Sequence, residues 1–196
     1  ATRRHLLDNE RVQLVASLAL CGIGREAVSE LARQTAEFLH ARPLAPRFFD
    51  RQVAFNLLPQ VGAPDHQGHT AVERRLVQEL RAVLGLPDLK LSVTCIQVPV
   101  FSGDSFNVAV QSRGAVELDA VNQVLNVADS VELVERDDYP TPVGDAVGQD
   151  VVYVGRVRQG IDDAQQLNLW LTTDNVRKGA ALNAVQIAQL LIKDRL

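Results

Sequence analysis

The stretch RVQLVASLALCGIGREAVSELARQTAEFL (residues 11–39) changes its periodicity part-way along. Up to residue 20, apolar residues alternate with Gln13 and Ser17, which is the period-2 pattern of a strand with one buried face. The segment CGIG (21–24) is a turn signal. Beyond it, apolar residues recur at the spacing of an amphipathic helix. The sequence therefore predicts a strand, a turn and then a helix over residues 25–40.

The rest of the chain alternates between helical and extended patterns. Thr70 and Glu73 form a capping-box signature, and Gly85 suits a left-handed cap, so a helix is predicted over residues 70–84. Two further helices are predicted, over 117–128 and over 178–192, and the second follows an Asp174-Asn175 cap. Strands are predicted over 91–100, 106–112, 131–135, 150–158 and 166–173.

The loops between the last three predicted strands are judged too short for parallel crossovers, so we expect these strands to pair antiparallel. The pattern as a whole predicts an α+β fold with a mixed, largely antiparallel sheet and helices packed on one face.

Composition excludes several classes of function. The chain has 196 residues, of which 46% are hydrophobic and 22% charged, as in a soluble globular domain. Its formal net charge of -4 provides no basic field for nucleic acid, and no apolar run approaches the ~20 residues of a membrane span. We therefore expect neither nucleic acid nor membrane as a partner. Because residue 1 is Ala and the chain lacks Met, we expect an excised domain.

Cysteine and histidine usage indicates neither a disulfide framework nor a metal site. Cys21 and Cys95 lie in apolar, strand-like stretches, which favours buried thiols in a reducing cytoplasm. His66 and His69 share a polar loop with Asp65, but no further ligand spacing accompanies them. We expect a cytoplasmic protein without a metal ion.

Five segments carry a family resemblance: AFNLLPQV (54–61), TCIQVPV (94–100), YPTPV (139–143), VGRVR (154–158) and LNLWLTTDNVRKGAALNAVQIAQLL (167–191). In order and spacing they resemble aspartate-semialdehyde dehydrogenases, most of all the divergent Usg-type paralogues. The resemblance implies a glyceraldehyde-phosphate-dehydrogenase-like C-terminal domain over residues 1–196, which binds substrate and forms a homodimer. It also implies an NADP-binding Rossmann domain with the nucleophilic Cys before residue 1, so we expect this domain alone to bind no cofactor.

Three positions depart from the family pattern. The family's TCxRVPVxxxHS stretch supplies an Arg for the substrate carboxylate and the catalytic His, whereas TCIQVPVFSGDS (94–105) has Gln97 and Asp104 there. The family's Gln in a QAxSGxG turn orients the substrate, whereas LALCGIG (18–24) has Leu18. Asp is a weak base near neutral pH and Gln carries no charge, so the resemblance implies impaired proton transfer and impaired carboxylate binding.

Other family positions are retained or replaced conservatively. The resemblance assigns Glu73 to the substrate amino group and Arg75, in place of Lys, to phosphate, but Glu73 also fits a helix cap and Arg75 a solvated face. It places Asn175, Lys178 and Gly179 near the nicotinamide end of NADP, where they also fit a helix N-terminus.

Two functional hypotheses remain open. One is a catalytically impaired paralogue with a structural or regulatory role, which could also pair with an active paralogue. The other is an active NADP-dependent semialdehyde dehydrogenase, acting on aspartate semialdehyde or a related substrate, in which Gln97 recognises an uncharged group and Asp104 is a weak base. The sequence before residue 1 would separate them.

Overall fold

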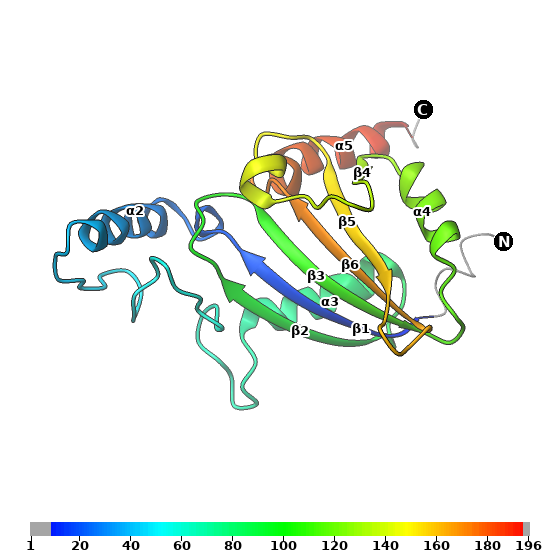
Figure 1. Cartoon of the computed structure of the whole chain (residues 1–196), viewed down its shortest axis with the longest axis horizontal. Coiled ribbons are helices and arrows are strands. Elements are labelled where there is room, and N and C mark those ends of the chain that lie inside the picture. Colours follow the sequence, from blue (N-terminus) through cyan, green and yellow to red (C-terminus); the bar gives the residue numbers. More distant parts are fainter. Residues whose placement is uncertain (1–8, 194–196) are drawn as a thin grey trace.

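The computed structural model describes residues 9–193, and its centre is a six-stranded sheet in the order β2-β1-β3-β6-β5-β4 (Figure 1). The strands are β1 (Asn9–Leu18), β2 (Lys90–Gln97), β3 (Asp104–Ser112), β4 (Val131–Leu133), β5 (Val152–Gln159) and β6 (Gln166–Thr173). Strand β1 pairs parallel with β2 and antiparallel with β3, and β6 pairs antiparallel with both β3 and β5. The predicted mixed, largely antiparallel α+β fold is confirmed.

One predicted pairing is wrong. Strands β5 and β6 are antiparallel as expected, but β4 runs parallel to β5. The physical reason is the length of the connection. Residues 134–151 separate the two strands and include a helical turn at Pro142–Ala146, which gives the chain enough length for the crossover that parallel neighbours need.

The helices are α2 (Arg25–Leu39), α3 (Ala71–Leu84), α4 (Leu118–Asn126) and α5 (Asn183–Lys193). Helix α3 has the predicted ends: the Thr70 hydroxyl accepts from the Glu73 N–H in a capping box, and Gly85 closes the helix at φ 66°. The last predicted helix is divided, because Arg177–Leu182 form a π-helical turn before α5 begins. No helix in residues 9–193 is long and apolar enough to cross a membrane.

The two faces of the central sheet differ in character. The register places Leu14, Val108 and Leu169 side by side on the face that also carries Val93, where α3 packs against β2. The opposite face carries the row of Gln13, Ala109 and Asn168, which adjoins the row of Val15, Asn107 and Trp170. In Figure 1, α3 lies behind the sheet, and the front is crossed only near its upper end by the segment that follows β4.

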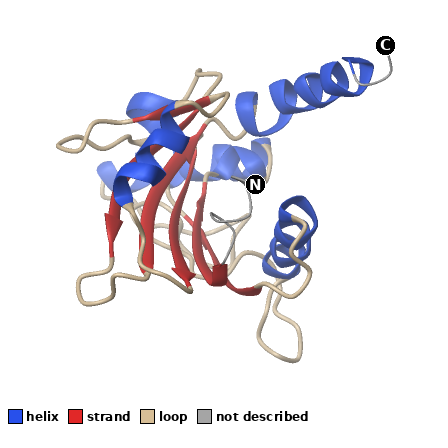
Figure 2. Cartoon of the chain, turned by 90° about the vertical axis from the view of Figure 1, so that its right-hand side faces the viewer, coloured by secondary structure: helices blue, strands red, loops and turns tan. Residues whose placement is uncertain are grey.

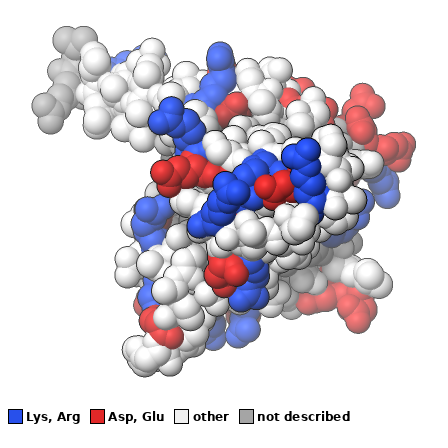
Figure 3. Space-filling model, turned by 90° about the vertical axis from the view of Figure 1, so that its left-hand side faces the viewer, with Lys and Arg blue, Asp and Glu red and all other residues white. Residues whose placement is uncertain are grey.

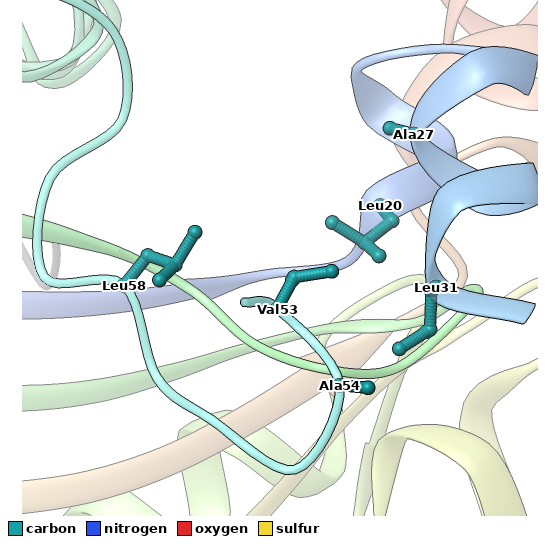
Figure 4. Close-up of a cluster of buried hydrophobic side chains, with 6 residues drawn as sticks. All are labelled: Leu20, Ala27, Leu31, Val53, Ala54 and Leu58. Atoms are coloured by element: carbon teal, nitrogen blue, oxygen red, sulfur yellow. The ribbon is translucent and has the colours of Figure 1, made fainter. Parts of the chain in front are cut away.

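A small apolar cluster fixes the segment that approaches the end of β1. Its members come from the turn after β1, from α2 and from the 53–58 segment: Leu20, Ala27, Leu31, Val53, Ala54 and Leu58 (Figure 4). The fully buried Gln34 side chain reinforces it, since its Oε1 accepts from the Val53 N–H (2.8 Å) and the Ala54 N–H (3.1 Å). The cluster brings Leu58 into antiparallel pairing with Gln97.

Candidate functional site

The three residues predicted to replace family site residues meet at one edge of the sheet. Leu18 and Gln97 end the parallel strands β1 and β2 in register with each other, and Asp104 begins β3. Parallel strands that end together place their last side chains close to one another. The structure therefore brings together the residues that the sequence comparison singled out.

Gln97 is buried, with 2% of its surface exposed. Its Nε2 donates to the carbonyl oxygen of Leu18 at 2.5 Å, and its backbone exchanges hydrogen bonds with Leu58. Its Oε1 has no hydrogen-bond partner within the described residues, although it is also buried. A buried acceptor without a partner is unfavourable, so this amide is only half satisfied.

Asp104 is largely enclosed and accepts a hydrogen bond at Oδ1 from the Ala19 N–H, at 2.8 Å. Burial, with a smaller contribution from the negative charge of Asp174, raises the pKa of Asp104 to about 6, and the Ala19 N–H opposes this shift. Near neutral pH the side chain is still mostly ionised. It differs from an imidazole because it is negatively charged when it is ready to accept a proton, and because Oδ1 is already held by the Ala19 N–H.

Asn175 links the two loops that flank Asp104. Its Oδ1 accepts from the Gly103 N–H (3.1 Å) and contacts the Cys21 thiol (3.3 Å), and its Nδ2 donates to the Cys21 sulfur (3.1 Å). Gly103 adopts φ 92°, and a Cβ there would lie 2.8 Å from the Pro142 carbonyl oxygen. Both polar groups of the Asn175 amide are therefore used within the chain.

Asp174 is a site residue that sequence reasoning recognised only as a helix cap. It is buried, and its carboxylate accepts from the N–H groups of Arg177 (2.7 Å), Gly148 (2.8 Å) and Val176 (2.9 Å). Burial acts to raise the pKa of Asp174, but these backbone donors outweigh it and hold the pKa below its usual range. Its charge acts on Asp104, a proximity that the position of Asp174 directly after β6 could have indicated.

Glu73 acts as a helix cap and as a tie to the sheet. Its Oε2 accepts from the Thr70 N–H at 2.9 Å, and its Oε1 accepts from the Cys95 N–H at 3.1 Å. Burial opposes ionisation of Glu73, but these two hydrogen bonds help to hold its pKa below the usual range. Burial, with the Glu73 charge adding to it, raises the pKa of Cys95 to about 11. Cys95 is therefore an inert buried thiol.

The remaining family positions lie at the surface or make contacts inside the chain. Arg75 is 70% exposed and forms an ion pair with Glu79 at 3.4 Å. Lys178 Nζ donates to Gln186 Oε1 at 2.7 Å, and the Gly179 N–H donates to the Asp174 carbonyl oxygen at 2.8 Å. The contacts of Lys178 and Gly179 are of the kind found where a helix begins. The roles of these residues and of Arg75 in cofactor and phosphate binding stay predictions.

The end of the molecule formed by α2 carries charges of both signs. A cavity of about 530 Å³ beside α2 is lined by Arg25, Glu26, Ser29, Glu30, Arg33, Arg47 and Phe48. Arg33 pairs with Glu30 (2.7 Å) and Glu37 (2.6 Å). Figure 3, which views this end, shows Lys and Arg interspersed with Asp and Glu. The acidic side chains beside these arginines therefore prevent a continuous basic surface at this end.

Comparison with known proteins identifies the lineage. A family model described as the semialdehyde dehydrogenase dimerisation domain matches residues 2–178. The chain belongs to the semialdehyde dehydrogenase family. It is 58% identical over 193 residues to the USG-1 protein homolog of Azotobacter vinelandii, and the match covers 98% of this chain but 57% of that protein. The predicted resemblance to aspartate-semialdehyde dehydrogenases of the Usg type is confirmed.

Solved structures of family members share the fold. A probable aspartate-semialdehyde dehydrogenase from Pseudomonas aeruginosa superposes with a TM-score of 0.94 at 57% identity, covering 98% of this chain and 57% of that one. Aspartate semialdehyde dehydrogenase II from Vibrio cholerae superposes at 0.93 with 39% identity, covering 99% of this chain and 58% of that one. This semialdehyde dehydrogenase family chain thus spans a little over half the length of the relatives that it matches.

Proposed function

We propose that this chain is the C-terminal, substrate-binding and dimerisation part of a catalytically impaired semialdehyde dehydrogenase relative with a structural or regulatory role. One observation carries the proposal: Gln97 and Asp104, which the resemblance assigns to the family positions for carboxylate binding and proton transfer, are both hydrogen-bonded to the Leu18–Ala19 peptide at the end of β1. Leu18 stands at the third position and has no polar side-chain group. The proposed site therefore lacks a free cation, an imidazole and an orienting amide.

The expected loss is large. Removal of general acid and base catalysis costs about 100-fold to 10,000-fold in rate. A neutral amide in place of a guanidinium weakens a carboxylate contact by about 1 kcal/mol or more, which is roughly tenfold in affinity. An Asp104 carboxylate beside a nucleophilic thiol would also disfavour the reactive thiolate.

The proposal includes an NADP-binding N-terminal domain before residue 1 in the full-length protein. It is supported by the relatives, of which this chain spans 57% in the Azotobacter case, and by α5, which projects from the sheet in Figure 2. Five apolar side chains of α5 are more than half exposed: Val185, Ile187, Leu190, Leu191 and Ile192. They lie on more than one side of the helix, which is typical of a helix buried in a larger protein.

An active dehydrogenase for a different substrate is the second candidate. The unpartnered, buried Oε1 of Gln97 favours it, because an acceptor suits a substrate that offers an N–H or O–H group and not a carboxylate. The retained DNVRKGAALNAVQ segment (174–186) supports it as well. In this case Asp104, whose pKa is raised to about 6, would be the base.

We further propose a cytoplasmic homodimer. The matched family model is described as a dimerisation domain. Figure 1 leaves the sheet face opposite α3 largely uncovered, so a second subunit could pack there with two-fold symmetry. A mixed dimer with an active paralogue would use the same face.

The proposal is tested by reverting the three positions in the full-length protein. Leu18→Gln, Gln97→Arg and Asp104→His together should raise phosphate-dependent reduction of NADP with aspartate semialdehyde well above background, provided that the N-terminal part has a nucleophilic Cys. Each single change should do little, because residues that act as a unit contribute non-additively. Equal activity of the single and triple variants would show that these three positions do not cause the low activity of the wild-type protein.

A further inference from the structure

One peptide group is held from both sides by Gln97 and Asp104. The Leu18 carbonyl oxygen accepts from Gln97 Nε2 at 2.5 Å, and the Ala19 N–H of the same peptide donates to Asp104 Oδ1 at 2.8 Å. The Leu18 oxygen accepts a second hydrogen bond, from the Val98 N–H, at 3.1 Å. Two lone pairs and one N–H make up the hydrogen-bonding capacity of this peptide, so it is completely satisfied.

Water has little access to this peptide. Ala19 is 1% exposed and Gln97 is 2% exposed. A buried N–H needs an acceptor from the protein, and β1 ends at Leu18, where its ladder can no longer supply one. Among residues 9–193, the Asp104 carboxylate is the only group that accepts a hydrogen bond from the Ala19 N–H.

The peptide lies at the centre of a junction between three segments. The turn after β1 donates from the Leu20 N–H to the Val100 oxygen (3.0 Å) and from the Cys21 N–H to the Phe101 oxygen (2.9 Å). Asn175, directly beyond β6, joins the same two segments through Cys21 and Gly103. Movement of the Leu18–Ala19 peptide would therefore disturb the loop before β3 and the segment that holds Asn175.

We infer that Gln97 and Asp104 form a lock on the Leu18–Ala19 peptide that closes the substrate position from within. The inference rests on the proposed function and deepens it, because it states how the site is shut. One N–H of the Gln97 amide and one oxygen of the Asp104 carboxylate are bound to the protein's own backbone, which fixes both side chains in place. A ligand carboxylate at this position would meet the Asp104 charge, and the buried Gln97 would offer it no more than one further N–H and no positive charge.

Hydrogen exchange in the full-length protein tests the lock. Asp104→Ala removes the acceptor, whereas the matched control Asp104→Asn keeps an acceptor oxygen of similar reach. We expect the Ala19 amide, resolved from overlapping peptides, to exchange about tenfold to a hundredfold faster in the Ala variant, and close to the wild-type rate in the Asn variant. The quantity compared is the exchange rate of the Ala19 amide divided by the exchange rate of amides within α3. A general destabilisation of the fold raises both rates and therefore does not change this ratio. Equal relative rates in the two variants would overturn the lock.

Closure of the site is tested separately with L-aspartate as the carboxylate probe. Titration into the wild-type protein should leave Ala19 exchange unchanged, whereas Gln97→Arg with Asp104→His should show slower exchange of the 18–22 segment as the probe binds. Protection of this segment by L-aspartate in the wild-type protein, or no response in the double variant, would overturn closure by the lock. Neither outcome depends on turnover, so an inactive wild type in which L-aspartate protects the 18–22 segment would contradict the lock and leave the proposed function standing.

Discussion

At the scale of single residues, the substitutions redirect polar groups inward. Asp104 can accept hydrogen bonds, but its Oδ1 already accepts one from the Ala19 N–H, 85 positions earlier in the chain. The position of Asp104 has an electrostatic cost, because burial and the nearby Asp174 charge both disfavour the ionised carboxylate and raise its pKa. Asp104 is thus a source of pH dependence in the stability of the fold.

The first prediction concerns this pH dependence. The pKa of Asp104 is about 6 in the folded protein against about 3.9 for an exposed Asp, so the native state binds the proton more tightly than the unfolded chain. The contribution of Asp104 to the free energy of unfolding should therefore fall as the pH rises from about 4 through about 6, by up to about 3 kcal/mol. Carboxyls with lowered pKa values, such as Asp174 and Glu73, contribute in the opposite direction, so the effect of Asp104 is obtained by comparison with a variant. Urea unfolding across this range measures the effect.

Asp104→Asn is the matched comparison for that measurement. It keeps an acceptor for the Ala19 N–H and removes the charge, so the variant should match the wild type near pH 4 and be the more stable protein near pH 8. An identical pH dependence of stability in the two proteins would show that Asp104 does not carry the shifted titration.

At the scale of elements, Glu73 fastens α3 to β2 through the Cys95 N–H. Glu73→Ala removes half of the capping box and leaves the buried Cys95 N–H without this acceptor, so we expect a loss of about 2–4 kcal/mol in the free energy of unfolding. The exposed Arg75, paired with Glu79, is the control: Arg75→Ala should change stability by less than about 1 kcal/mol. If Glu73→Ala proved as mild as Arg75→Ala, the tie to β2 would be unimportant.

Elements with local signals were predictable, and those that depend on distant contacts were not. Helix α3 was predicted because its cap, apolar stripe and terminal Gly85 all agree. The parallel pairing of β4 with β5 was missed because the crossover over residues 134–151 lacks the pattern of a long helix. The sequence predicts Gln97 and Asp104 as altered site positions, and this stays a prediction. Their shared contact with the Leu18–Ala19 peptide has no sequence signal, because it arises only when three strand ends meet in space.

At the scale of the whole molecule, one sheet face offers a surface for a second subunit. Trp170 lies on the face opposite α3, in the row with Val15 and Asn107, and its Nε1 donates to the Pro140 oxygen at 2.8 Å. We expect Trp170→Glu to convert a dimer into a monomer at micromolar concentration, as measured by light scattering. Trp170→Phe controls for the lost Pro140 contact and should remain dimeric. A monomeric wild type, or a Glu variant that stays dimeric, would place the interface elsewhere.

The central claim is that the full-length protein does not perform the family's reaction. The most direct measurement is the steady-state rate of phosphate-dependent NADP reduction with aspartate semialdehyde, using purified full-length protein and an active family member as the positive control. Because the proposal implies that proton transfer and carboxylate binding are both impaired, we predict a turnover at least a thousandfold below the ordinary enzyme range of about 1–1,000 per second. A turnover within about tenfold of that range would contradict the account.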